Sequence, residues 1–188
     1  LDCILTASGC WEKPSKILIT SDKLRQLFTS EDTILLFGAD YPSEEFYLTN
    51  ELKKSLGCKY LTNEDIISVF TKHIAWFNNK DVEWRANFYV YLSKSSASAY
   101  FLKKKKKIAC VPLESGEMAI PEKDTVFFPL NSEMNYGFEH ELKILEGELL
   151  LKASRDSETI AKFFTTLNVR SDNPFELIKR NILPFHAS

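Results

Sequence analysis

A short phrase that combines an apolar run with a glycine and a proline occurs twice, and it constrains the fold more than any other feature. The first copy, CILTASGCWEKPSK, begins at Cys3, and the second, CVPLESGEMAIPEK, begins at Cys110. Glycine supplies the positive φ of a tight turn, and proline fixes φ at the entry to a returning segment. Each phrase therefore predicts a β-hairpin. The paired strands are expected over about residues 2–7 and 16–20 in the first copy, and 108–111 and 126–128 in the second.

The two phrases align without a gap at an offset of 107 residues. Five aligned positions are identical, namely Cys3/Cys110, Ser8/Ser115, Gly9/Gly116, Pro14/Pro121 and Lys16/Lys123. A weaker match at an offset of 111 relates Leu56-Gly57-Cys58 to Leu167-Asn168-Val169. We expect a tandem duplication with halves over residues 1–106 and 107–188. The alternative to a duplication is chance similarity between two hairpins, and the alternative to two halves is one compact domain.

Most of the remaining sequence predicts helices, so the expected fold class is α+β, mostly helical with two small β-hairpin units. Apolar residues recur at helical spacing, and acidic or capping residues precede several of these segments. The expected helices cover about residues 22–28, 42–56, 62–77, 81–94, 156–167 and 174–184. The apolar run TILLF, residues 33–37, predicts a buried strand.

Composition and charge limit the classes of partner. The 188 residues are 44% hydrophobic, which is enough to bury a core, and the net charge of −2 exerts no long-range attraction on nucleic acid or anionic membranes. No apolar run approaches the roughly 20 residues of a membrane-spanning helix. The four cysteines form no C-x-x-C pair, so we expect reduced thiols in a cytoplasmic or otherwise intracellular protein. Because the chain begins inside a strand-like phrase, we also expect it to be a fragment of a larger protein.

A run of five lysines is the most visible charged feature, and it consists of Lys103, Lys104, Lys105, Lys106 and Lys107. It predicts either a contact for nucleic acid or an acidic partner, with Tyr100 and Phe101 available for stacking, or a solvated helix end. Lysines at a helix C-terminus interact favourably with the last carbonyls. The run stands alone in a chain of slightly negative charge, so the helix end is the favoured interpretation.

The sequence predicts no catalytic, cofactor-binding or metal-binding residues, and we expect the protein not to be an enzyme. His140-Glu141 lacks the second histidine of a zinc-protease motif, and no phosphate-binding glycine loop occurs. A site assembled from dispersed residues, such as Cys58 with His73, is the enzymatic alternative. Aromatic residues at helical spacing usually form a core. From that set, Trp76 and Tyr89 are the two expected at a partner surface.

Several phrases resemble the repeats that follow the ATPase-like domain of sacsin-type proteins, which are large chains with a histidine-kinase/gyrase/heat-shock-chaperone-like fold. The matching phrases are Gly9-x-Trp11-x-x-Pro14, Gly116-x-Met118-x-x-Pro121 followed by Val126-Phe127-Phe128-Pro129, Leu167-Asn168-Val169, and Phe175-Glu176-Leu177-Ile178 to Ile182-Leu183-Pro184-Phe185. Residues 60–105 match only as helices. The family's nucleotide site is not carried over, because no G-x-G occurs.

This resemblance implies a non-enzymatic scaffold or protein-interaction segment of a large multidomain, chaperone-like ATPase protein. The implied partners are another protein or other domains of the same chain, with no cofactor and no membrane. A nucleic-acid-binding module that uses Lys103 to Lys107 is the alternative function.

Overall fold

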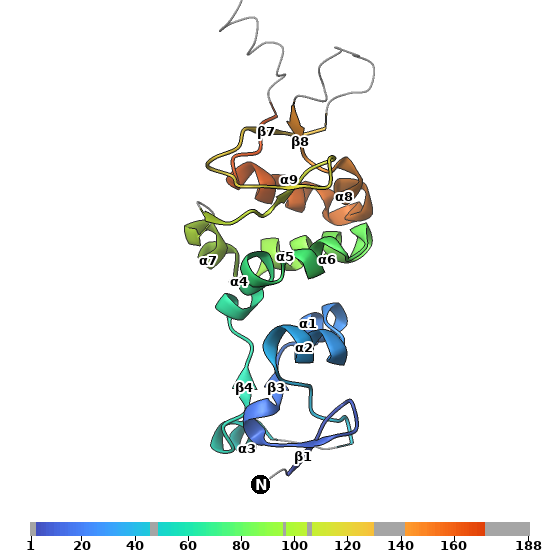
Figure 1. Ribbon diagram of the computed structural model, residues 1–188, viewed down its shortest axis with the longest axis vertical. Coiled ribbons are helices and arrows are strands. Elements are labelled where there is room, and N and C mark those ends of the chain that lie inside the picture. The colour runs from blue at the N-terminus through green and yellow to red at the C-terminus, as the bar shows by residue number, and fades with distance from the viewer. Residues whose placement is uncertain (1–2, 46–48, 96, 105–106, 130–141, 172–188) are drawn as a thin grey trace, which may run out of the picture. The chain divides into compact units, whose positions relative to one another are not determined.

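The computed structural model describes residues 3–45, 49–95, 97–104, 107–129 and 142–171 (Figure 1). These residues form helices interspersed with two-stranded sheets, so the expected α+β class is confirmed. The chain divides into two compact units, Leu1–Ile74 and Ala75–Ser188, and each unit is described by itself. No helix in the described ranges is long and apolar enough to cross a membrane.

The first hairpin is shorter than the sequence predicts. Strand β1 (Ile4–Leu5) pairs antiparallel with β2 (Trp11–Glu12), and Gly9 supplies the turn with a φ of 83°. The expectation that residues 16–20 return to pair with residues 2–7 is wrong. The turn closes early because the Thr6 hydroxyl accepts a hydrogen bond from the Cys10 amide at 3.2 Å.

The returning segment instead forms the centre of a small parallel arrangement. After the short 3₁₀ helix η1 (Pro14–Lys16), strand β3 (Leu18–Ile19) pairs parallel with β4 (Lys59–Tyr60). On its other side, the Leu18 amide donates to the Asp40 carbonyl at 2.7 Å. Segments from three parts of the first unit therefore lie side by side.

The run TILLF is helical, which corrects the strand predicted over residues 33–37. It belongs to α2 (Ser30–Phe37), which follows α1 (Asp22–Leu27). Thr29 and Asp32 form a capping box in which each side chain accepts from the other residue's amide at 3.1 Å. Gly38 ends the helix in the left-handed conformation. These two signals outweigh the β-propensity of a short apolar run.

The later helices of the first unit agree with the sequence only in part. α3 (Asn50–Ser55) is shorter than the helix expected from Pro42, because Pro42 forms an antiparallel bridge with Thr6 and the cap is Thr49. α4 (Asn63–Lys72) begins where Thr62 predicts it. Ile4, Ile17 and Cys58 form a buried cluster, so the core of this unit joins the hairpin to the strand after α3.

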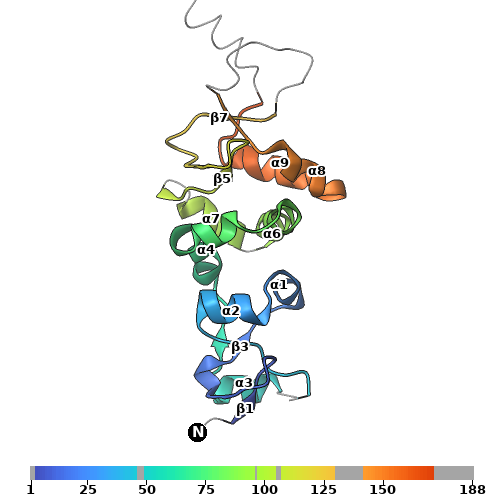
Figure 2. The ribbon, with the colours of Figure 1, turned by 45° about the vertical axis from the view of Figure 1, so that its right-hand side comes forward.

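Helices form most of the described second unit, as Figure 2 shows from a second direction. They are α5 (Ile74–Asn78), which starts at the division between the units, α6 (Val82–Lys94), α7 (Ala97–Lys104), α8 (Gly147–Lys152), the 3₁₀ helix η4 (Ser154–Asp156) and α9 (Ser157–Thr166). The Asp81 side chain caps α6 by accepting from the Trp84 amide at 2.7 Å. α6 packs against both α8 and α9. The helices expected over residues 81–94 and 156–167 are confirmed.

The second hairpin has the same design as the first. β5 (Val111–Pro112) pairs antiparallel with β6 (Met118–Ala119), and Gly116 supplies the turn with a φ of 82°. The expectation that residues 126–128 pair with residues 108–111 is wrong, because β7 (Val126–Phe127) does not join this hairpin. It pairs parallel with β8 (Lys143–Ile144). The helix expected over residues 174–184 lies outside the described residues.

Backbone hydrogen bonds in the two hairpins occur at aligned positions. The Cys3 amide donates to the Glu12 carbonyl at 3.1 Å, and the Cys110 amide donates to the Ala119 carbonyl at 3.0 Å. Short hairpins with a glycine turn share such bonds for local reasons, so the tandem duplication stays a prediction. The halves over residues 1–106 and 107–188 stay a prediction as well. In space, the division at residue 74 groups α6 and α7 with the second hairpin.

Candidate functional site

A polar pocket of about 370 Å³ in the first unit lies beside the C-terminal end of α2 and the start of α4. Its lining residues are Leu36, Phe37, Lys59, Thr62, Glu64, Asp65, Ser68, Lys72 and His73. The set contains two lysines, a histidine, two hydroxyls and two carboxylates, so its side chains offer varied chemistry.

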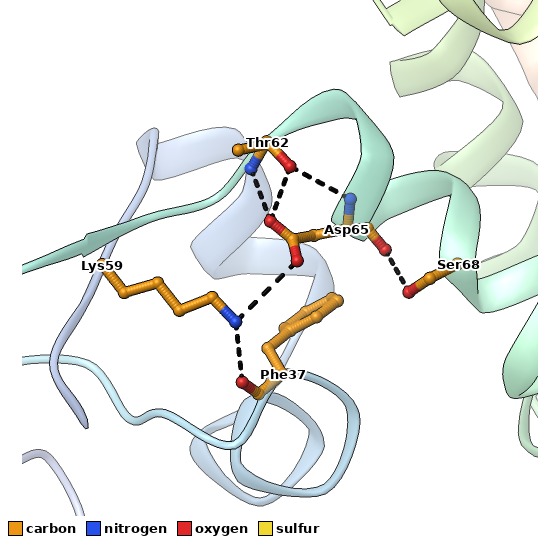
Figure 3. Close-up of polar contacts among 5 residues, drawn as sticks. All are labelled: Phe37, Lys59, Thr62, Asp65 and Ser68. Atoms are coloured by element: carbon orange, nitrogen blue, oxygen red, sulfur yellow. Dashed lines mark hydrogen bonds and ion pairs between the residues drawn. The ribbon is translucent and has the colours of Figure 1, made fainter. Parts of the chain in front are cut away.

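Lys59 joins the two helix ends that border this pocket (Figure 3). Its Nζ donates to the carbonyl oxygen of Phe37 at 2.8 Å and lies 3.8 Å from Oδ1 of Asp65. The last carbonyls of a helix have no intrahelical partner, and a cation interacts favourably with that end. The Lys59 ammonium group therefore ties the end of α2 to the start of α4.

Thr62 and Asp65 cap the start of α4 in the same view. Oδ2 of Asp65 accepts from the Thr62 amide at 2.9 Å and from the Thr62 hydroxyl at 2.7 Å. The Thr62 hydroxyl in turn accepts from the Asp65 amide at 3.2 Å. Ser68 donates its hydroxyl to the Asp65 carbonyl, within the same helix. The polar groups drawn in Figure 3 therefore hold helix ends. The Ser68 hydroxyl donates its hydrogen bond to a main-chain carbonyl and not to a side chain that could act as a general base.

The enzymatic alternative of Cys58 with His73 finds no support in this arrangement. His73 follows α4 and lines the pocket, whereas Cys58 is buried with Ile4 and Ile17. Burial raises the pKa of the Cys58 thiol, so the reactive thiolate is disfavoured. All four cysteines lie in described ranges and are free thiols.

A buried carboxylate, Asp40, organises the hairpin side of the first unit. It is 4% exposed, and it accepts hydrogen bonds from the Ser30 hydroxyl, the Ser8 amide at 3.1 Å and the Tyr41 amide at 2.7 Å. Burial disfavours the charged form, but these hydrogen bonds outweigh it and hold the pKa of Asp40 below its ordinary value. Asp40 therefore links the glycine turn to the start of α2.

A second polar cluster, partly buried, lies in the second unit. Arg85 of α6 forms an ion pair with Glu146, which precedes α8, with 2.7 Å between the guanidinium nitrogen and Oε1. The Tyr89 hydroxyl donates to the Cys110 carbonyl at 2.7 Å, and burial raises the pKa of Tyr89 well above its ordinary value. These contacts fasten α6 to the hairpin and to α8.

A wider hollow of about 550 Å³ lies beside residues 121–125 and 168–170 in the second unit. Asp124 is one of its lining residues, and its carboxylate lies 2.6 Å from Lys143 Nζ and accepts from the Ile120 amide at 2.7 Å. Two hydrogen bonds lower the pKa of Asp124. The larger effect comes from Lys143, and the smaller one from the Ile120 amide. Among the residues described, no three histidine, cysteine or acidic side chains gather to hold a metal ion.

The two aromatic residues expected at a partner surface differ in their surroundings. Tyr89 is 0% exposed, which corrects the expectation, because its ring packs 5.0 Å from that of Phe164. Trp76 is half-buried, with its ring 5.2 Å from that of Trp84 and 4.5 Å from Lys80 Nζ. A role for Trp76 in partner binding stays a prediction.

The lysine run begins in the last turn of a helix. α7 ends at Lys104, and Lys103 and Lys107 are exposed, while Lys105 and Lys106 lie outside the described residues. This position agrees with the helix-end interpretation of the first lysines. Binding of nucleic acid by Lys103 to Lys107 stays a prediction.

Exposed leucines on α3 are the feature that the sequence analysis missed. Leu52 is 42% exposed and Leu56 is 36% exposed, and α3 has no buried residue. The available signal was the four-residue spacing of these leucines, which places them on one side of a helix. Lys53, three residues before Leu56, borders that side, and Lys54 lies opposite. Because α3 contains no buried residue, it gains little stability from burial in its own unit.

Comparison with models of protein families, with curated proteins and with solved structures finds no match to this chain.

Proposed function

We propose that this chain is a non-enzymatic protein-interaction segment, a scaffold part of a large, chaperone-like ATPase protein of the sacsin type. The observation that carries the proposal is the exposed leucine pair of α3, Leu52 and Leu56. Apolar side chains gathered on a helix that buries nothing are typical of a surface that binds another protein. The link to the sacsin type rests on the sequence resemblance of the hairpin phrases.

The roles of the polar residues support the same proposal. Asp40 and Asp65 hold turns and helix starts, and Lys59 holds the end of α2. Arg85 and Glu146 fasten α6 to the start of α8. These groups stabilise the framework, and such a framework suits a scaffold that presents a surface.

An intracellular setting belongs to this proposal. The four cysteines are free thiols, and Cys10 is exposed. Reduced, exposed thiols persist in the reducing environment of the cytosol, whereas secreted proteins usually oxidise them.

Site-specific photo-cross-linking tests the interaction function. A photoreactive benzophenone side chain replaces Leu52 in the full 188-residue chain, and the matched control carries it at Lys23, an exposed residue of α1. Irradiation in extract of the source cells is expected to yield a discrete protein adduct from position 52 and none from position 23. Equal labelling at both positions, or no adduct at either, would contradict the proposal.

A further inference from the structure

The C-terminal ends of α3 and α9 share a pattern of backbone hydrogen bonds. The Leu56 amide donates to the Leu52 carbonyl at 2.9 Å, and the Leu167 amide donates to the Phe163 carbonyl at 3.2 Å. The next residue has a positive φ in both helices, 74° at Gly57 and 67° at Asn168. Leu52 therefore corresponds in position to Phe163, and Leu56 to Leu167.

The bonds that follow extend this correspondence. The Cys58 amide reaches back to the Lys53 carbonyl at 3.2 Å, and the Val169 amide reaches back to the Phe164 carbonyl at 3.1 Å. The next residue in each unit then bonds a parallel segment, with the Lys59 amide donating to Ile17 at 2.9 Å and the Arg170 amide donating to Val126 at 2.8 Å. The two helix ends therefore lead into equivalent strand positions, and their outer faces can be compared residue by residue.

The corresponding faces differ in what covers them. In the second unit Phe163 is 4% exposed and Leu167 is 0% exposed. The Phe163 ring lies 6.5 Å from that of Tyr89 on α6 and 5.9 Å from that of Phe101 on α7. Two helices with aromatic side chains thus cover this face of α9, while Leu52 and Leu56 remain exposed.

We propose that the α3 face, defined as Leu52, Leu56 and the bordering Lys53, docks an amphipathic helix of a partner protein, with aromatic residues on its apolar side and an acidic residue beside them. This inference rests on the proposed interaction function. The aromatic side is argued from α6, which covers the corresponding face in the second unit. The acidic residue is argued from charge, because Lys53, three residues before Leu56 on the same side of the helix, takes the position of the buried Phe164.

A peptide derived from α6 is the probe for this inference. It has the sequence of residues 81–94 with Arg85→Glu and Lys94→Glu, and the control peptide also carries Tyr89→Ser and Leu92→Ser. Each peptide is titrated into the full chain while leucine methyl resonances are followed by NMR. Saturable shifts are expected at Leu52 and Leu56 below about 1 mM peptide, the weak end of specific binding. Leu151, an 80% exposed leucine of α8, is expected not to shift, and the control peptide is expected to move neither set.

Substitutions on the α3 face test its chemistry. Leu52→Asn is expected to weaken the acidic peptide by about tenfold or more, the amount expected from losing one buried leucine contact, and Leu151→Asn is expected to leave it unchanged. Lys53→Glu is expected to weaken binding of the acidic peptide and to strengthen binding of the unmodified residue 81–94 peptide relative to it. Lys54→Glu, on the opposite side of α3, is the matched control and is expected to have a smaller effect. Leu52, Lys53, Lys54 and Leu151 are not buried, so we expect each of these variants to keep the melting temperature of the unmodified chain.

Three outcomes would overturn the inference. They are no methyl shift at Leu52 or Leu56, equal binding of the control peptide, and saturable shifts on raising the protein concentration alone, which would make a second copy of this chain the occupant. Adducts from position 52 without peptide binding would overturn the helix inference and leave the proposed function standing. Peptide binding without any adduct would contradict the proposed function and, with it, the partner protein that this inference names.

Discussion

Replacing Lys59 with methionine tests how the first unit is held together. The substitution keeps an unbranched apolar side chain of similar length and removes the ammonium group that bonds the Phe37 carbonyl. We expect it to lower the free energy of unfolding of the first unit, because the carbonyl at the end of α2 loses its partner (Figure 3).

The distances set the size of this effect. A hydrogen bond from a charged group contributes roughly 1.5–3 kcal/mol, and the 33% exposure of the Lys59 side chain places this one at or below the low end. The ion pair with Asp65, at 3.8 Å, adds no more than about 0.5 kcal/mol. We therefore expect a loss of about 1–1.5 kcal/mol, and a coupling energy between Lys59→Met and Asp65→Asn below about 0.5 kcal/mol.

Urea denaturation followed by methyl NMR provides the assay, with Ile17 reporting on the first unit and Ile160 on the second. A loss of this size is expected to lower the Ile17 midpoint by roughly 0.5–1 M urea. Lys54→Met, at an exposed lysine of α3, is the matched control and is expected to leave the midpoint unchanged. An unchanged Ile17 midpoint in Lys59→Met would refute the reasoning, and so would a coupling energy that accounts for the whole loss.

Three further predictions concern the second unit, the buried carboxylate and the turns. Tyr89→Phe is expected to cost about 1–2 kcal/mol by calorimetry, because the Cys110 carbonyl loses a buried partner; full stability would contradict this. Asp40→Asn is expected to lower the urea midpoint at pH 7 and to differ less from wild type below about pH 4, because a lowered native pKa gives stability that is lost as the carboxylate is protonated. An equal difference at pH 7 and pH 3 would be evidence against that role. Gly9→Ala and Gly116→Ala are each expected to lower the free energy of unfolding by about 1 kcal/mol, because both glycines have a positive φ that alanine adopts only with strain. Thermal melts followed by circular dichroism measure this loss, and unchanged melting temperatures would contradict it.

Local signals predicted the well-capped elements. Thr62 begins α4, Asp81 caps α6, and the apolar spacing of α9 buries Ile160, as the sequence indicates. Gly9 and Gly116 turn the two hairpins at the expected residues. These features depend on neighbours within a few residues, so a single sequence contains them.

The errors arose where distant segments decide the outcome. Pairing of β3 with β4 joins residues some forty positions apart, and no hairpin rule contains that choice. The error over the run TILLF is of another kind, because the capping box of Thr29 with Asp32 that sets its conformation is a local signal, which the apolar composition of the run outweighed in the prediction. Tyr89 is buried because α9 packs against α6, and the sequence does not give that contact.

The roles of the candidate site residues could not be predicted from the sequence for the same reason. Leu52 and Leu56 look like ordinary helix residues in the sequence, and their significance depends on exposure and on comparison with Phe163 and Leu167. The part played by Lys59 likewise depends on the end of α2 lying next to the start of α4, which only the three-dimensional arrangement provides.

Competition for the photo-cross-link tests the central claim most directly. The adduct from position 52 is formed in the presence of a large excess of unlabelled full chain, or of the same chain carrying Leu52→Asn and Leu56→Asn. If these leucines bind the partner, the unlabelled chain abolishes the adduct and the double variant leaves most of it. Equal competition by both chains would contradict the claim that this surface of α3 binds the partner.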